Sequence, residues 1–156
     1  MEAREYKPED SVSVKNLILS VLKKEYPFDP SAYQDSDIND VTGTYSGEGN
    51  GFFVVEEKGE VAGVIGVKKD GIDSALVRRF FVKEGQRNKG FGTILLSRAI
   101  AFCKSGNYGK LVFRATDRMS KAVNILKKLG FTETEDLEVS GFHIHTFVLQ
   151  LKDQDR

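Results

Sequence analysis

The sequence is poor in the residues that mark several common classes of protein. Its 156 residues include one cysteine, two histidines and no tryptophan. The single Cys103 excludes an internal disulfide and a cysteine-based metal site, a pattern typical of a reducing cytoplasm. Lysine and arginine together number 23, as do aspartate and glutamate, so the net charge is zero. This balance argues against nucleic-acid binding driven by bulk charge.

Long hydrophobic runs are also missing. No apolar run approaches the roughly 20 residues that a helix needs to cross a bilayer. Residues 1–6 lack the apolar core of a signal peptide. Internal repeats and low-complexity linkers are absent too. We therefore expect one cytoplasmic domain over residues 1–156, without a membrane or nucleic-acid partner, since this length supports one complete core.

Hydrophobic periodicity predicts an α+β domain. Apolar residues at helical spacing predict helices that end near Tyr26, Lys104 and Leu129, with a short extra helix around residues 31–41. Alternating or continuous apolar runs predict strands over residues 2–7, 52–55, 61–67, 75–82, 110–115, 131–135 and 143–151. The turn at Lys58-Gly59 predicts an antiparallel hairpin. Strand 75–82, helix 88–104 and strand 110–115 should form a right-handed parallel crossover.

The most informative stretch is Gln86-Arg-Asn-Lys-Gly-Phe-Gly-Thr93, where a strand pattern ends and a helix pattern begins. Backbone N–H groups at a helix start lack intrahelical partners, and the helix dipole adds partial positive charge there. Gly90 and Gly92 would let a phosphate approach these amides, while Arg87 and Lys89 add charge. We predict an anion site, with a tight turn carrying solvated cations as the alternative.

Two familiar phosphate loops do not fit this stretch. A Walker loop requires lysine and a hydroxyl residue after its last glycine, and Phe91-Gly92 stands there instead. A dinucleotide fingerprint requires a third glycine, and the run that begins Gly90-Phe-Gly lacks it. Neither nucleotide hydrolysis nor dinucleotide binding is therefore predicted.

What remains is Arg-x-x-Gly-x-Gly, formed by Arg87, Gly90 and Gly92. It resembles the [Q/R]-x-x-G-x-[G/A] cofactor motif of the GNAT superfamily of acyl-CoA-dependent N-acetyltransferases. Phe80-Phe81-Val82 stands in place of that family's cofactor-contacting strand. Leu129-Gly130-Phe131 resembles the end of its second cofactor helix, with Ala122 at a small-residue position. The resemblance covers about residues 51–131, leaving residues 1–50 as a variable acceptor part and 132–156 as C-terminal strands.

The resemblance implies a three-layer fold: a mixed, mostly antiparallel sheet of six to seven strands, flanked by about four helices around a central parallel βαβ crossover. It implies transfer of an acetyl group from acetyl-CoA to a primary amine of a small molecule or peptide, by direct attack in a ternary complex. A strand amide near Phe80 or Phe81, with Phe81 first, would stabilise the oxyanion. The implied cofactor-binding residues are Phe80, Phe81, Val82, Arg87, Asn88, Lys89, Gly90, Phe91, Gly92 and Thr93, and no metal is implied.

Acid–base chemistry is harder to assign from the sequence. A general base must lie near the amine, and the candidates are Glu56, Glu57, Asp73, His143 and His145, with Glu56 first and water-mediated deprotonation as the alternative. The family often has a tyrosine acid where Leu126 stands and an asparagine where Met119 stands. We therefore expect the leaving thiolate of CoA to take its proton from Tyr33, Tyr45 or water. The missing tyrosine keeps open a second hypothesis, a non-catalytic acyl-CoA-binding or sensing module.

The acceptor side carries both signs of charge. Asp35 and Asp37, with Asp29 and Asp40, favour a cationic amine, and a solvated loop is the alternative. Arg78 and Arg79 are adjacent on a strand, so only one should face the acceptor, where it would bind a carboxylate; an ion pair with a neighbouring acid is the alternative. We take Arg79, Asp35 and Asp37 as candidate acceptor-binding residues.

Two further expectations concern the remaining motifs. Cys103 lies at helical spacing beside Ala99 and Phe102, which predicts a core residue. His143 and His145, two apart on one strand, are thin support for a metal site. By analogy with related folds, the last strand is expected to be a sheet edge at which two copies pair as a homodimer.

Overall fold

The structure is a computed structural model that describes residues 2–25, 36–85, 89–117, 119–139 and 141–152. Its elements follow the predicted order. The strands are β1 (Ala3–Glu5), β2 (Gly51–Glu57), β3 (Glu60–Lys69), β4 (Ser74–Val82), β5 (Lys110–Thr116), β6 (Thr132–Val139) and β7 (Phe142–Gln150). The helices are α1 (Ser11–Glu25), α2 (Ser36–Asn39), α3 (Val41–Tyr45), α4 (Phe91–Ser105) and α5 (Ser120–Lys128), with a 3-10 turn η1 (Pro8–Asp10).

All seven strands form one sheet, in the order β1-β2-β3-β4-β5-β7-β6. Each neighbouring pair is antiparallel except β4 and β5, which are parallel and connected through α4. This confirms the mixed, mostly antiparallel sheet and its parallel crossover. The last strand, β7, lies between β5 and β6, so the expectation that it forms a sheet edge is wrong. The chain folds back as a β6–β7 hairpin, which leaves β6 outermost.

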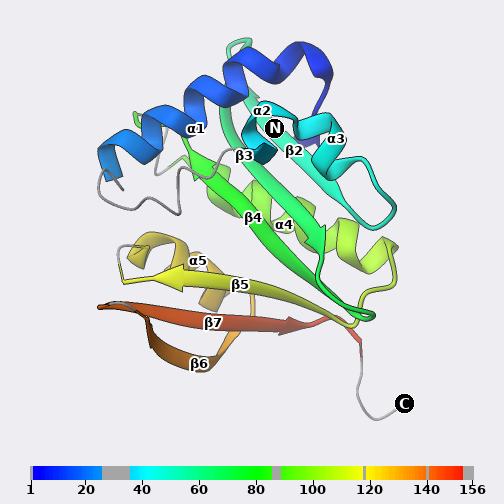
Figure 1. Ribbon diagram of the computed structural model, residues 1–156, viewed down its shortest axis with the longest axis vertical. Helices are drawn as coiled ribbons and strands as arrows, with labels where there is room; N and C mark the ends of the chain where they lie inside the picture. The colour runs from blue at the N-terminus through cyan, green and yellow to red at the C-terminus, as the bar shows by residue number, and fades with distance from the viewer. Residues whose placement is uncertain (1, 26–35, 86–88, 118, 140, 153–156) are drawn as a thin grey trace.

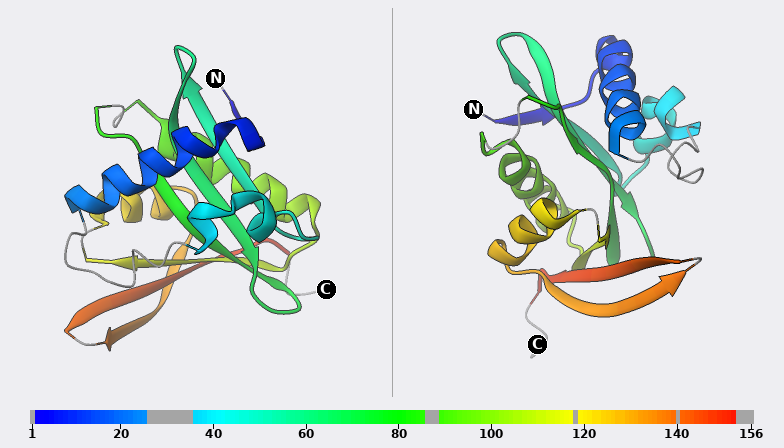
Figure 2. Two further views of the ribbon diagram at one scale, coloured as in Figure 1. Left: turned by 45° about the horizontal axis from the view of Figure 1, so that its top comes forward. Right: turned by 90° about the vertical axis from the view of Figure 1, so that its left-hand side faces the viewer.

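The helices cover the sheet in two layers (Figure 1, Figure 2). Figure 2, right, shows α4 and α5 on one face and α1, α2 and α3 on the other. Strand β2 serves both layers because its side chains alternate: Phe53 packs in the core beneath α4, whereas Val54 packs with Ile18 beneath α1. Within the described residues, no helix is both long and apolar enough to cross a membrane.

Two local predictions can be compared directly with the structure. The expected helix around residues 31–41 is replaced, within its described part, by the shorter α2 and α3, which are separated at Asp40. This carboxylate accepts a hydrogen bond from the Gly43 N–H at 2.9 Å and so caps α3. Cys103 is fully buried, and burial raises the pKa of its thiol to about 12. Its predicted role in the core is confirmed.

Candidate functional site

Strands β4 and β5 part soon after they begin. Their parallel ladder joins residues 74–76 to residues 110–112, whereas β4 continues to Val82 and β5 to Thr116. Figure 1 shows the two strands meeting near the start of β4 and diverging toward their carboxyl ends. An extended ligand can pair with a strand edge that has no neighbouring strand. This divergence borders the segment Phe80 to Val82.

A β-bulge lies in β4 beside this divergence. Gly66 of β3 pairs with Arg78 and Val64 pairs with Phe81, so two residues of β4 oppose one residue of β3. The first of these two, Arg79, has a φ of 51°, in the left-handed region that non-glycine residues rarely adopt. Bulges redirect the side chains around them and are frequent next to active sites.

The register after the bulge decides which backbone amides face β5. The Lys83 N–H donates to the Ala62 carbonyl at 2.8 Å. Because hydrogen-bonded and non-hydrogen-bonded pairs alternate in antiparallel strands, the Phe81 N–H points toward β3. The Phe80 N–H points the other way, toward the divergence. Of the two predicted oxyanion donors, the amide of Phe81 is thus directed away from β5, whereas the amide of Phe80 faces the divergence.

The Arg79 side chain binds Asp37 of α2. Its Nε and Nη2 donate to the two carboxylate oxygens, each at 2.9 Å, and the Tyr45 hydroxyl donates to the same carboxylate at 2.9 Å. The side chains of Arg79 and Asp37 are only 9% and 7% exposed. Burial acts to raise the pKa of Asp37, but the hydrogen bonds from Arg79 and Tyr45 outweigh it and hold that pKa below its usual value.

Arg79 and Asp37, both predicted to bind the acceptor, are therefore partners of each other. This is the ion-pair alternative considered for Arg79 from the sequence. Tyr45, named as an alternative acid, donates to Asp37, and burial raises the pKa of its hydroxyl well above the usual value. These three side chains therefore form one buried network that joins α2 and α3 to the β4 bulge.

Arg78 lies on the same face as Arg79, contrary to the expected alternation. It pairs with Gly66, and a Cβ built on Gly66 would point at Tyr45 and Phe52, on the α3 side of the sheet. The bulge explains the difference, because the extra residue in β4 turns Arg79 to the same side. Arg78 is exposed and, unlike Arg79, forms no ion pair with any described residue.

Helix α4 begins without a side-chain cap. Its N-cap is Gly90 at φ 84°, a left-handed conformation that glycine adopts readily. A Cβ built on Gly90 would have no atom of the described residues within 4 Å, so the space before the helix is open. The first turn carries no acidic residue, and the N–H groups of Phe91, Gly92 and Thr93 have no intrahelical acceptor. This arrangement can bind an anion.

Gly92 has a second role, in packing. A Cβ built on it would lie 2.9 Å from Cδ1 of Ile125 in α5 and 3.3 Å from Cζ of Phe80. Phe80 packs edge-on against Phe113 of β5, with ring centroids 5.8 Å apart. The missing side chain lets α4, α5 and β4 approach one another, so Gly92 can offer a ligand only its backbone amide.

Comparison with known proteins agrees with this arrangement. The model of the acetyltransferase (GNAT) family matches residues 16–131. The chain belongs to the GNAT acetyltransferase family. The match begins well before residue 51, so the family relationship extends into the part of the chain expected to be variable. A comparison with curated proteins found no match.

Solved structures of GNAT proteins share the fold of the whole chain. A GNAT-family acetyltransferase from Staphylococcus aureus Mu50 is 21% identical, with a TM-score of 0.82 and coverage of 97% of this chain and 99% of that chain. A putative acetyltransferase from Salmonella typhimurium, solved with its cofactor acetyl-CoA, is 17% identical, with a TM-score of 0.83 and coverage of 99% and 95%. A ribosomal-protein-alanine N-acetyltransferase from Brucella melitensis is 14% identical, with a TM-score of 0.83 and coverage of 97% and 100%. At these identities the likeness shows the fold alone.

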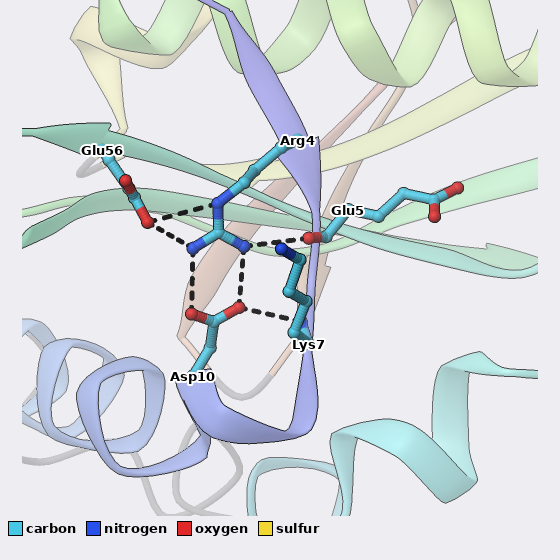
Figure 3. Close-up of polar contacts among 5 residues, drawn as sticks. All are labelled: Arg4, Glu5, Lys7, Asp10 and Glu56. Atoms are coloured by element: carbon cyan, nitrogen blue, oxygen red, sulfur yellow. Dashed lines mark hydrogen bonds and ion pairs between the residues drawn. The ribbon is translucent and has the colours of Figure 1, made fainter. Parts of the chain in front are cut away.

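Glu56, the leading base candidate of this GNAT domain, lies in an ion-pair network near the sheet edge (Figure 3). Its Oε1 accepts from Nε of Arg4 at 3.2 Å and also from Nη2. The same guanidinium binds both oxygens of Asp10, each at 2.9 Å. Strand β3 separates β2 from β4. We therefore assign Glu56 to the network that joins β1, η1 and β2.

Two other base candidates of the GNAT domain also have partners. The Glu57 carboxylate lies 3.2 and 3.3 Å from Nζ of Lys89, so it anchors the glycine turn to β2. Asp73 precedes β4, at the end of the strand opposite to Phe80, and its Oδ1 accepts from the Gly109 N–H at 2.9 Å. Glu57 thus supports the glycine turn, whereas Asp73 supports the backbone where β4 and β5 begin.

The two histidines of the GNAT domain are bound to carboxylates. Nδ1 of His143 lies 3.1 Å from Asp136, and the hydrogen bond to this carboxylate raises the pKa of His143. Nε2 of His145 lies 2.7 Å from Asp117 and Nδ1 lies 3.1 Å from Glu133. These two hydrogen bonds raise the pKa of His145.

The remaining predicted residues divide into two groups. Tyr33, Asp35, Arg87 and Asn88 lie outside the described residues. Leu126 is fully buried and Met119 is the N-cap of α5, so neither position of the GNAT domain supplies an acid.

One residue at the divergence was missed from the sequence. Oγ1 of Thr116, the last residue of β5, is buried and has no hydrogen-bond partner among the described residues. Buried hydroxyls nearly always have a partner, so Thr116 is a candidate contact for a ligand of the GNAT domain. The only sequence signal is a hydroxyl residue that ends an apolar strand.

Proposed function

We propose that the protein is an N-acyltransferase that moves an acetyl group from acetyl-CoA to a primary amine. The observation that carries this proposal is the divergence of β4 and β5 beside the uncapped, acid-free start of α4. One feature suits an extended amide-bearing chain, and the other suits a phosphate. Membership of the GNAT family supports the same reaction class.

The described residues fit acetyl-CoA as the co-substrate. The amides of Phe91, Gly92 and Thr93 would hold its pyrophosphate. Lys89, now paired with Glu57, and Arg87, which lies outside the described residues, would add positive charge. The edge of β4 from Phe80 to Val82 would pair with its pantetheine arm. When bound, acetyl-CoA supplies the activated acetyl group, while the protein orients it and shields it from water.

The chain's own contribution to the reaction would be electrostatic. The N–H of Phe80 points toward the divergence and would donate to the carbonyl oxygen of the thioester. Removing one donor of this kind typically costs about 3 kcal/mol of transition-state stabilisation. The Thr116 hydroxyl, buried at the end of β5, would donate to the ligand from the opposite strand.

The acceptor we propose carries a carboxylate as well as an amine, as an amino acid or a peptide does. Arg79 is already bound to Asp37, so it offers little to a substrate. The exposed Arg78 stands on the same face; its charge acts on Asp37 at longer range, and it forms no close ion pair with a described residue. A guanidinium in this setting binds carboxylates in bidentate fashion.

A second function is favoured by one observation. Leu126 fills, in the core, the position where the family often has its tyrosine acid. A domain that binds acyl-CoA as a sensor needs no such acid. Release of free thiol from acetyl-CoA on addition of an amine separates the two functions, because only an enzyme produces it.

The binding site is tested with two variants at one position. Gly90→Ala and Gly90→Glu carry the same backbone strain at φ 84°, but only the second places a carboxylate before the helix. We expect acetyl-CoA to raise the melting temperature of wild type and of Gly90→Ala. The melting temperature of Gly90→Glu should not change on addition of acetyl-CoA. Equal shifts in both variants would remove the α4 start from the site.

A further inference from the structure

Five ionisable side chains gather at the β6–β7 hairpin, beside the end of β5. His143 and His145 of β7 face Glu133 and Asp136 of β6, and Asp117 approaches from the segment between β5 and α5. The His145 ring is at the centre, with 21% of its side chain exposed. One ligand atom each from Glu133, Asp136 and His145 lies within 4.8 Å of the others.

A β-bulge brings this group together. Glu133 and Asp136 are three residues apart, so in a regular strand they would face opposite sides. Glu133 pairs with Phe147 and Asp136 pairs with His145. The two pairs are therefore three residues apart along β6 but only two residues apart along β7. The extra residue turns both carboxylates toward the histidines. The sequence spacing conceals this arrangement.

In the part of the chain that the structure describes, no lysine or arginine forms an ion pair with this group. Among the described residues, the ion pairs of Asp117, Glu133 and Asp136 are all with the two imidazoles. Three carboxylates therefore surround His145, and one of them also binds His143, on a solvent-accessible surface. This setting attracts a cation.

We propose that Glu133, Asp136 and His145 bind a divalent transition-metal ion of the zinc class. His145 would coordinate through Nδ1, which lies 3.1 Å from Glu133 and 3.9 Å from Asp136. The proposal concerns a site that the sequence alone did not predict, and it is independent of acetyl transfer.

The other nitrogen of His145 supports this assignment. Metal-bound histidines almost always donate their second ring N–H to a carboxylate or carbonyl, which fixes the orientation of the ring. Nε2 of His145 already lies 2.7 Å from Oδ1 of Asp117. Asp117 is therefore a positioning residue. The histidine–carboxylate hydrogen bond that accompanies metal-bound histidines is present before any metal binds.

The ligand set selects the kind of metal. One imidazole nitrogen with two carboxylates suits Zn²⁺, whereas Ca²⁺ and Mg²⁺ prefer oxygen ligands alone. Tetrahedral Zn²⁺ with bonds of about 2.0–2.2 Å holds its ligand atoms roughly 3.5 Å apart. The two carboxylates are 41% and 51% exposed, so side-chain rotation brings them to that spacing. A water molecule or His143 would complete the coordination.

Calorimetry of the full chain, without a polyhistidine tag, at pH 8 tests the site. We expect one Zn²⁺ per chain, with Mg²⁺ and Ca²⁺ at least 100-fold weaker. His145→Gln and Asp136→Asn should abolish binding, and Asp117→Ala should weaken it about 10–100-fold. Glu135→Gln is the matched control, because Glu135 pairs with Thr146 and so faces the other side of β6; its affinity should equal that of wild type.

A second measurement does not depend on any variant folding. The chain has only two histidines, so their imidazole NMR signals are readily assigned in wild type. Zn²⁺ should shift the His145 signals at one equivalent. The absence of binding in wild type would overturn the proposal. Unchanged binding in His145→Gln, or Mg²⁺ affinity equal to that of Zn²⁺, would overturn it equally.

Discussion

The buried pair of Arg79 and Asp37 allows a quantitative prediction about stability. Asp37→Asn keeps the shape of the side chain but removes its charge, so the Arg79 guanidinium stays buried without an anionic partner. Breaking one side of a buried pair costs about 3–5 kcal/mol. Both side chains are under one-tenth exposed and three hydrogen bonds of 2.9 Å converge on the carboxylate, so the solvent cannot compensate.

The expected loss translates into a large thermal shift. In a chain of this length, 1 kcal/mol corresponds to roughly 2–4 °C, so the melting temperature should fall by about 6–20 °C. Urea unfolding at pH 7 gives the free energy directly. Glu48→Gln, at an exposed position, is the control for loss of one carboxylate and should change stability by less than about 0.5 kcal/mol.

A double variant tests the physical reason for that loss. If the cost comes from the uncompensated guanidinium, Asp37→Leu combined with Arg79→Met should be more stable than Asp37→Asn alone, because no buried charge remains. A single-variant loss below about 1 kcal/mol would show that water reaches the pair. A double variant less stable than the single one would refute the explanation from buried charge.

Two further predictions follow from the packing of α4 and from the Arg4 network. Gly92→Ala should destabilise the protein by about 1–3 kcal/mol in urea unfolding, because its Cβ would crowd Ile125 and Phe80, and an unchanged midpoint would refute this close packing. Hydrogen bonds from Arg4, together with the Lys7 amide and against the effect of burial, lower the pKa of Asp10. Because the pKa of Asp10 is lower in the folded state than in the unfolded state, its ionisation stabilises the fold. This stabilisation is complete above the unfolded-state pKa of about 3.9 and is lost as the pH falls through the folded-state pKa. The stability difference between wild type and Asp10→Asn should therefore be constant from about pH 5 to pH 7 and shrink below about pH 4; a constant difference down to pH 2 would contradict the ion pair.

Periodicity and turn chemistry predicted the elements because their causes are local. The apolar face of α4, the strand runs of β2 to β5 and the glycine turn before α4 are each visible within about a dozen residues. The family resemblance then gave the order of the layers. The break between α2 and α3 was not predicted. The helical pattern continues across Asp40 in the sequence, and nothing in it shows that the Asp40 side chain caps a new helix.

Features that depend on pairing between strands could not be predicted. The bulge at Arg79 exists because β3 and β4 differ by one residue between two fixed pairs, and it places Arg78 and Arg79 on one face. The bulge in β6 in the same way unites Glu133 with Asp136. Alternation along a single strand predicts the opposite in both places. The partners of Asp37, Glu56 and Asp73 likewise come from elements distant in sequence.

The short ladder between β4 and β5 means that the sheet consists of two ribbons, of four and three strands, joined by backbone hydrogen bonds only near Ser74–Leu76. Beyond that seam, the two ribbons are held together by the side chains packed beneath α4 and α5. A ligand threaded between them would act as an eighth strand and close the seam along its length. Slower amide exchange on both ribbons at once would then be the signature of occupancy, even where the ligand touches only one of them.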